Sequence, residues 1–124
     1  MTMPFTSIVS PWHNDDYDSY VIGYVKDTMG GKRLIGIENQ GDPGSNQKTW
    51  IKACVKAGCE VIVAACRSYG QTKEDACRIA RRNGYEVVEV TTLFRHGGPV
   101  LPNGTDLRDA FADNIQSLIM ECLK

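Results

Sequence analysis

Short apolar runs alternate with amphipathic segments along this chain, and glycines mark most of the boundaries between them. Runs rich in β-branched residues predict strands at Phe5–Ser10, Arg33–Glu38, Glu60–Cys66 and Glu86–Thr92. The third run is apolar after its first residue, which is typical of a strand buried on both faces of a parallel sheet. Pro11 ends the first run, because proline has no N–H to continue a ladder.

Three other segments have the periodicity of amphipathic helices. The first covers Asn46–Ala57 and is stopped by Gly58, while the second opens at Thr72 and is stopped by Gly84. Thr105 is the predicted cap of the last helix. The inward side of that helix is a regular apolar stripe made of Leu107, Phe111, Ile115, Leu118, Ile119 and Cys122.

The segment Asp15–Met29 fits two different structures. As a helix it has acids at its start, an apolar side and a glycine pair at its end. As a strand, Tyr20–Val25 has suitable residue types, and the turn that follows closes a hairpin onto Leu34–Ile37. We take the helix as the prediction and keep the hairpin as the alternative.

Strands that alternate with helices through short connections predict an α/β fold with right-handed crossovers. The 124 residues suit a single domain. We therefore expect a three-layer domain with a mostly parallel sheet of about four strands, Rossmann-like or flavodoxin-like, with 2-1-3-4 as the favoured strand order. The strong apolarity of the runs Arg33–Glu38 and Glu60–Cys66 also fits these two strands as neighbours.

Composition narrows the classes of partner. A net charge of −1 gives no general reason to expect binding to nucleic acid or to an anionic membrane. The longest apolar run is much shorter than a bilayer span. The five cysteines form no C-x-x-C pair, and without an export signal we interpret them as reduced thiols of a cytoplasmic protein.

The loops that follow the strands carry most of the chemically useful side chains. In a parallel sheet these loops meet at one edge, and ligands bind there. The opposite loops are short and contain mainly glycines that end helices. The predicted ligand-binding residues at this edge are Trp12, Asn39, Asp42, Ser45, Lys48, Arg67, Ser68, Tyr69, Thr72 and Arg95.

The loop from Gly41 to Thr49 is similar to a Walker A phosphate loop, but Gln47 stands where that motif has glycine and the spacing is one residue too long. It therefore predicts a looser anion site at a helix N-terminus. A second anion site is predicted at the next helix start, where Arg67 and Thr72 lie close in sequence.

His13, Glu38 and His96 are the predicted catalytic residues, acting as general acid or base or as ligands of a divalent metal, although their spacing matches no known metal motif. We expect the chain to bind a nucleotide or another phosphorylated small molecule, and to hydrolyse or transfer at a phosphate or glycosidic bond. The alternative is a non-catalytic module that sequesters a ligand or binds a protein, including a second copy of itself.

Overall fold

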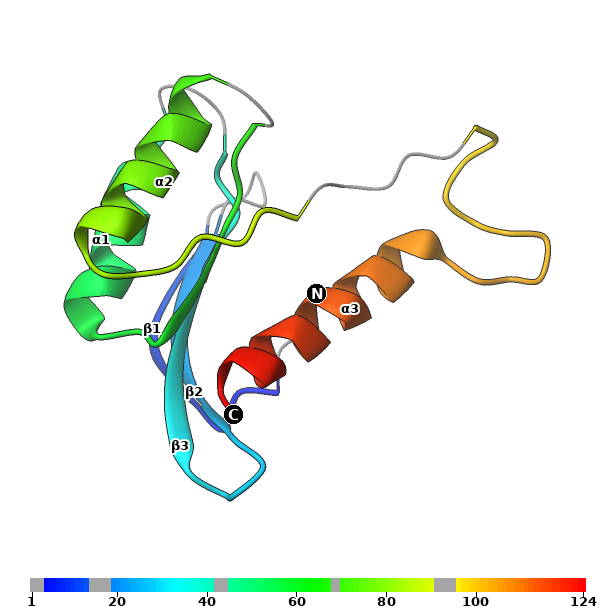
Figure 1. Ribbon diagram of the computed structural model, residues 1–124. Helices are drawn as coiled ribbons and strands as arrows, with labels where there is room; N and C mark the ends of the chain where they lie inside the picture. Colours follow the sequence, from blue (N-terminus) through cyan, green and yellow to red (C-terminus); the bar gives the residue numbers. More distant parts are fainter. Residues whose placement is uncertain (1–3, 14–18, 42–44, 68–69, 91–95) are drawn as a thin grey trace.

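The computed structural model describes residues 4–13, 19–41, 45–67, 70–90 and 96–124, with the backbone alone at 10–13 and 19 (Figure 1). The described chain contains four strands, which are β1 (Ser7–His13), β2 (Ser19–Lys26), β3 (Lys32–Glu38) and β4 (Val61–Ala64). It also contains three helices, which are α1 (Gln47–Ala57), α2 (Gln71–Arg82) and α3 (Leu107–Cys122).

The sheet is mixed, with the strand order β1-β2-β3-β4. β1 pairs antiparallel with β2, β2 pairs antiparallel with β3, and only β3 and β4 are parallel. The prediction of a mostly parallel Rossmann-like sheet, and with it the 2-1-3-4 order, is therefore wrong. The crossover from β3 through α1 to β4 is the one parallel connection of the sheet that the described residues contain.

The error comes from Asp15–Met29, which was predicted as a helix. The part of this segment that the structure describes contains β2. Ile22 and Val25 are both buried, at 3% and 0% exposure, but they belong to apolar clusters on opposite faces of the sheet. A spacing of three residues places side chains on one side of a helix but on two sides of a strand. Because both faces of β2 are covered, its pattern resembles that of a helix.

The turn between β2 and β3 explains how the hairpin closes. The Asp27 carboxylate accepts hydrogen bonds from the backbone N–H groups of Met29 at 2.9 Å and Gly31 at 2.8 Å. Gly30 has a φ of 81°, which glycine adopts without steric cost. The glycine pair that we read as a helix stop is thus part of a β-turn.

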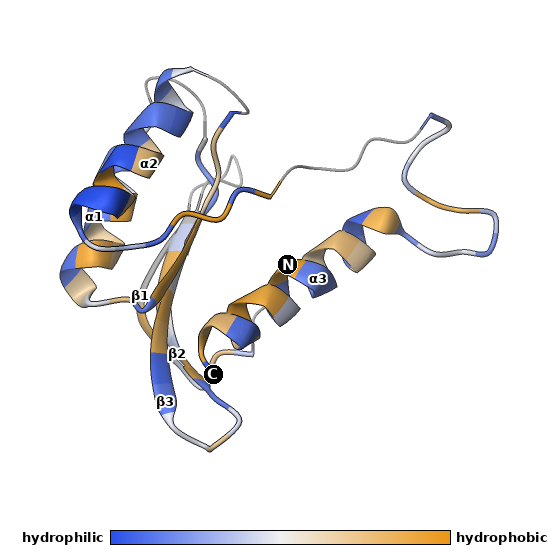
Figure 2. Ribbon diagram, in the orientation of Figure 1, coloured by the Kyte–Doolittle hydropathy of each residue, from blue (hydrophilic) through white to orange (hydrophobic). Residues whose placement is uncertain are grey.

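Helices cover both faces of the sheet, α1 and α2 on one side and α3 on the other (Figure 1). Cys54 and Cys59 pack with Ile22 under α1, while Ile119 and Leu123 at the end of α3 pack on Val25 and its neighbours. Apolar residues accordingly gather between helices and sheet, whereas the hairpin end of β3 is hydrophilic (Figure 2). Burial of these side chains is the main stabilising term.

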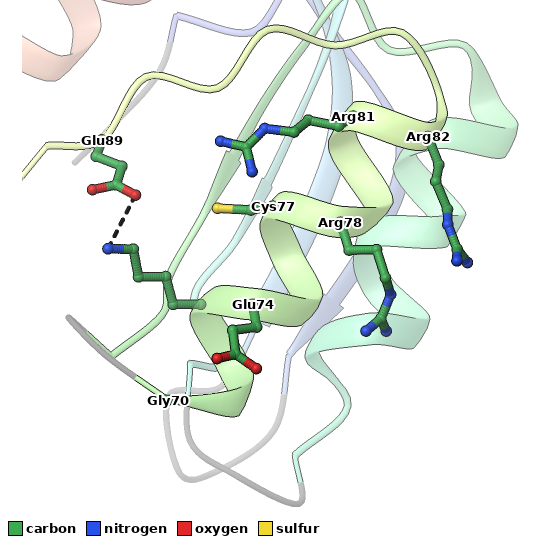
Figure 3. A pocket seen from close by; sticks show the side chains of 8 residues that line it. Gly70, Glu74, Cys77, Arg78, Arg81, Arg82 and Glu89 are labelled. Carbon is green, nitrogen blue, oxygen red and sulfur yellow. Dashed lines mark ion pairs between the residues drawn. The ribbon is translucent and has the colours of Figure 1, made fainter.

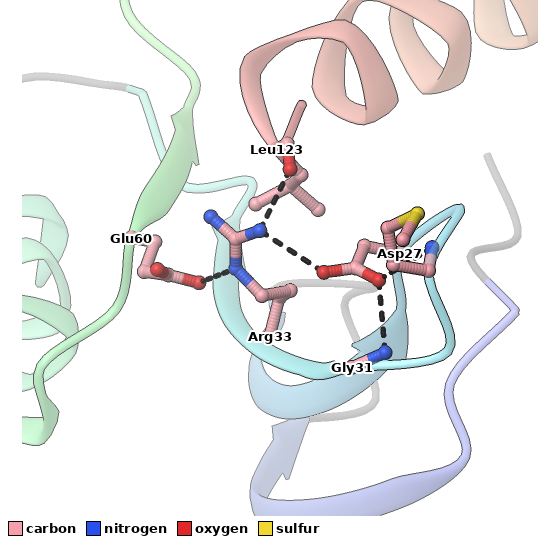
Figure 4. Close-up of polar contacts among 6 residues, drawn as sticks. Asp27, Gly31, Arg33, Glu60 and Leu123 are labelled. Atoms are coloured by element: carbon pink, nitrogen blue, oxygen red, sulfur yellow. Dashed lines mark hydrogen bonds and ion pairs between the residues drawn. The ribbon is translucent and has the colours of Figure 1, made fainter.

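Arg33 joins three elements at the hydrophilic end of the sheet (Figure 4). Its guanidinium pairs with Asp27 at 3.1 Å and with Glu60 at 2.5 Å. It also donates a hydrogen bond of 2.7 Å to the backbone oxygen of Leu123, directly after α3. One side chain therefore connects the β2–β3 turn, the start of β4 and the end of α3.

Two further strand predictions need correction. The predicted strand Glu86–Thr92 forms no ladder over residues 86–90, and its last two residues lie outside the description. β1 continues through Pro11 to His13. Proline is tolerated there because β1 is an edge strand, and the register shifts between Ile8 and Ser10.

Candidate functional site

One row of paired residues crosses the sheet at the end where β3 and β4 finish. Trp12 pairs with Tyr20, Tyr20 with Glu38, and Glu38 with Ala64. β1, β3 and β4 all run in the same direction, because β1 and β3 are each antiparallel to β2. Their carboxyl ends therefore meet at one edge although the sheet is mixed, and we call this end the carboxyl edge.

Glu38, the last residue of β3, is the buried acid of this edge. It is only 2% exposed, and its Oε2 atom accepts a 2.9 Å hydrogen bond from the backbone N–H of Gln40. Its Oε1 atom is buried and has no hydrogen-bond partner among the described residues. Burial raises the pKa of Glu38 from 4.5 to about 7, and the backbone N–H groups of Gln40 and Ala65 only partly oppose this effect.

The chain after Glu38 lies directly against the chain after β4. A Cβ atom on Gly41 would come within 2.9 Å of the backbone of Ala65 and Cys66, so only glycine fits there without a shift. Gln40 holds the loop in place, because its side-chain oxygen accepts a 2.8 Å hydrogen bond from the N–H of Asn46. The ends of β3 and β4 are thereby kept in contact beside Glu38.

Gln47 completes the framework of the carboxyl edge. It is the first residue of α1, it is 2% exposed, and its side-chain amide donates a 2.7 Å hydrogen bond to the Ala65 backbone oxygen. In the sequence, Gln47 stands out only as a departure from a phosphate loop. A buried amide at a helix start whose partner lies eighteen residues away gives no local signal.

Two of the residues predicted to hold an anion, Thr72 and Lys48, have partners within the protein. Thr72 is buried, and its hydroxyl accepts a 3.1 Å hydrogen bond from the Arg67 N–H. Lys48 approaches Asp75 of α2 at 3.8 Å. These contacts hold the start of α2 against the end of β4 and connect α1 with α2.

The other predicted site residues fall into three groups. Asn39 and Ser45 lie in the loop beside Glu38. His96 is exposed, and the segment 96–104 that it begins lies beyond the start of α3, far from the carboxyl edge (Figure 1), so the structure does not bring His96 to Glu38. The backbone of Trp12 and His13 reaches the edge, while their side chains lie outside the described residues, as do Asp42, Ser68, Tyr69 and Arg95 entirely.

A groove of about 680 Å³ runs along α2 and is a second candidate for a ligand site (Figure 3). Its cations do not converge, because Arg81 points toward Glu89 whereas Arg78 and Arg82 point to the other side of the helix. Lys73 is paired with Glu89 at 3.2 Å. The groove therefore resembles a solvated helix face more than an anion site.

Comparison with protein-family models, with curated proteins and with solved structures gives no match for this chain. Among the described residues, no helix is both long and apolar enough to span a bilayer. The described residues also contain no cluster of three or more histidine, cysteine, aspartate or glutamate side chains suited to a metal ion. The geometry of the carboxyl edge is thus the basis for a functional proposal.

Proposed function

We propose that this chain binds a nucleotide or another phosphorylated small molecule at the carboxyl edge, and that Glu38 transfers a proton during hydrolysis or transfer at a phosphate or glycosidic bond. The observation that carries the proposal is the buried Oε1 atom of Glu38, which has no hydrogen-bond partner among the described residues. A buried acceptor without a partner is costly, and functional sites are where such groups are kept.

The protonation behaviour of Glu38 supports the same role. With a pKa raised to about 7, its carboxyl group exists in both forms near neutral pH, which is the condition for efficient proton transfer. In the protonated form it can donate a hydrogen bond to a phosphate or leaving-group oxygen. In the ionised form it can accept a proton or bind a divalent cation that bridges to the phosphate.

The start of α1 supports anion binding beside Glu38. Asn46, the residue before the helix, makes no side-chain hydrogen bond to the first turn. The first N–H groups of a helix have no partner within the helix, and the positive end of the helix dipole favours an anion there. Lys48 lies in this turn with its side chain 55% exposed, so it can reach a ligand from the surface.

A thermal-shift screen of nucleotides and sugar phosphates, with and without Mg²⁺ or Mn²⁺, tests the binding step. A ligand present at about 100 times its Kd is expected to stabilise the protein by about 2.7 kcal/mol. For each ligand that binds, turnover is then measured for the wild type and for Glu38→Gln. We expect Glu38→Gln to keep binding and to lose about 10²- to 10⁴-fold in turnover.

Glu86→Gln is the matched control, because Glu86 is exposed and follows α2, away from the carboxyl edge. It should keep both binding and turnover. Equal turnover by Glu38→Gln and the wild type would refute the catalytic role. Binding that survives with no turnover of any phosphorylated ligand would favour a module that only sequesters its ligand.

Exposed apolar side chains favour an interaction module as the second candidate. Val88 and Val90 are 76% and 44% exposed, and Leu118 on α3 is 41% exposed. Sedimentation analysis across a concentration series tests association with a second copy of the chain. Under either candidate we place the protein in the cytoplasm, since all five cysteines are free thiols.

A further inference from the structure

The end of α1 brings two cysteines together through a helix-stop motif. Gly58 has a left-handed backbone, its N–H bonds to the Val55 oxygen at 3.0 Å, and the Cys59 N–H bonds to the Cys54 oxygen at 3.1 Å. These two bonds define a Schellman motif, in which the residues at the positions of Cys54 and Cys59 normally make an apolar contact. Here that contact is made by two thiols.

The two sulfurs face the same point on the sheet. A Cβ atom built on Gly36 would lie 2.5 Å from the Cys54 sulfur and 3.2 Å from the Cys59 sulfur. The absence of a side chain on Gly36 therefore leaves room for both thiols under β3. Cys54 and Cys59 are buried, at 0% and 2% exposure.

The close contact between the two thiols makes them unequal. It lowers the pKa of Cys59, and together with burial it raises the pKa of Cys54. When one of the pair ionises it is therefore Cys59, with Cys54 beside it as a thiol. That pairing, a nucleophilic sulfur next to a second cysteine able to resolve it, is the arrangement of a reversible redox pair.

We infer that Cys54 and Cys59 form an intramolecular disulfide when the folded protein meets hydrogen peroxide, linking the end of α1 covalently to the short loop that precedes β4. In the first step the Cys59 thiolate attacks one peroxide oxygen, the O–O bond breaks, and sulfenic acid and hydroxide form. In the second step the Cys54 sulfur displaces the hydroxyl group from the Cys59 sulfur. In total two thiols and one peroxide give one disulfide and two waters.

The other cysteines provide the contrast. Cys66 and Cys122 are exposed and Cys77 is half-buried, so they meet oxidants more easily, but neither Cys122 nor Cys77 is held in such a motif. The oxidant that must reach Cys54 and Cys59 is hydrogen peroxide, a molecule close to water in size. The inference is independent of the proposed function, since it concerns neither Glu38 nor a phosphorylated ligand.

Peptide mapping gives a direct test, because trypsin cleaves after Lys52, Lys56 and Arg67 and so separates the two cysteines onto peptides 53–56 and 57–67. The full-length Cys66→Ser variant leaves one cysteine on each peptide. The folded variant is treated with peroxide, quenched with catalase, unfolded in an alkylating reagent and digested without reductant. We expect the two peptides to be joined, lighter by two hydrogen atoms, and to separate after reduction.

A control variant makes the result decisive. Cys54→Ser in the same background should abolish the link and leave Cys59 to overoxidise, which shows that Cys54 is the partner. Peroxide-treated protein in which Cys54 and Cys59 both still alkylate would overturn the inference. So would Cys59 found as sulfinic or sulfonic acid while Cys54 is intact, or a link that appears only between two chains on a non-reducing gel.

Discussion

Two buried carboxylates in one half of the molecule have opposite surroundings. Asp75 on α2 is 5% exposed and accepts hydrogen bonds from Gln71 at 2.7 Å and Arg78 at 2.8 Å. Glu38 is 2% exposed and accepts one described side-chain hydrogen bond, from the Gln40 backbone. The pKa of Asp75 is lowered, first by its bond from Gln71, whereas burial raises the pKa of Glu38 to about 7.

The difference separates a structural acid from a functional one. The partners of Asp75 stabilise its charge, so Asp75 stabilises the fold as long as it is ionised. The ionised form of Glu38 is destabilised by its burial, so the folded protein is weakened wherever Glu38 is charged. A residue that lowers stability in this way is typical of sites kept for binding or catalysis.

Glu38→Gln should change the free energy of unfolding more than any other substitution considered below. The pKa of Glu38 rises from 4.5 in the unfolded chain to about 7 in the folded one, so the folded state holds its proton more tightly. Stability from this group is complete below pH 4.5 and is lost as the pH rises through about 7. Since one pKa unit corresponds to about 1.4 kcal/mol, urea unfolding at pH 8 should show Glu38→Gln to be more stable than the wild type by about 3 kcal/mol.

The matched control for that prediction is Asp75→Asn, for which the expected change in stability has the opposite sign. The lowered pKa of Asp75 makes its contribution complete above the ordinary value of 3.8 and lost as the pH falls below it. Asp75→Asn should therefore unfold at a lower temperature than the wild type at pH 7, and the difference should shrink as the pH falls below 3.8. A gain of stability in both variants at pH 8 would remove the distinction between the two acids.

Gln47→Leu tests the hydrogen bonds that hold the carboxyl edge around Glu38. It removes the donor to the Ala65 backbone oxygen without removing any charge, and the loss of such a partly buried hydrogen bond costs about 0.5–1.5 kcal/mol. Urea unfolding at constant pH measures the loss. Gln116→Leu on α3 makes the same exchange at a half-buried position and should cost less than about 0.5 kcal/mol; equal effects would argue against a role for the Gln47–Ala65 bond.

Lys48→Met should have the smallest effect on stability. Its side chain is 55% exposed and its ammonium group lies 3.8 Å from Asp75, and exposed ion pairs contribute little. We expect the unfolding temperature to change by no more than a few degrees, while affinity for any phosphorylated ligand found in the screen falls clearly. A large drop in unfolding temperature together with unchanged affinity would assign Lys48 to the α1–α2 junction and not to the anion site.

Local features of the fold could be predicted from the sequence. The helix stop at Gly58, the strand that ends at Glu38 and the final amphipathic helix were all visible in residue types and spacing. The acid at the strand end was among the predicted site residues, and the structure adds its burial.

Features that depend on tertiary contacts could not be predicted. β2 was misassigned because Ile22 and Val25 are covered from two sides, which no local pattern reveals. The Gln47–Ala65 bond joins residues on separate elements, and His96 was placed at the edge only because a parallel sheet was assumed. The carboxyl ends of three strands share an edge in this mixed sheet for a different reason, namely that β1 and β3 flank β2.

The most direct test of the central claim is a carboxyl-carbon NMR titration of Glu38, assigned by comparison with Glu38→Gln. We predict a midpoint near pH 7, because the side chain is buried and one of its oxygens lacks a partner among the described residues. A midpoint near 4.5 would mean that Glu38 is solvated or paired like an ordinary surface acid, and it would contradict the role assigned to the carboxyl edge.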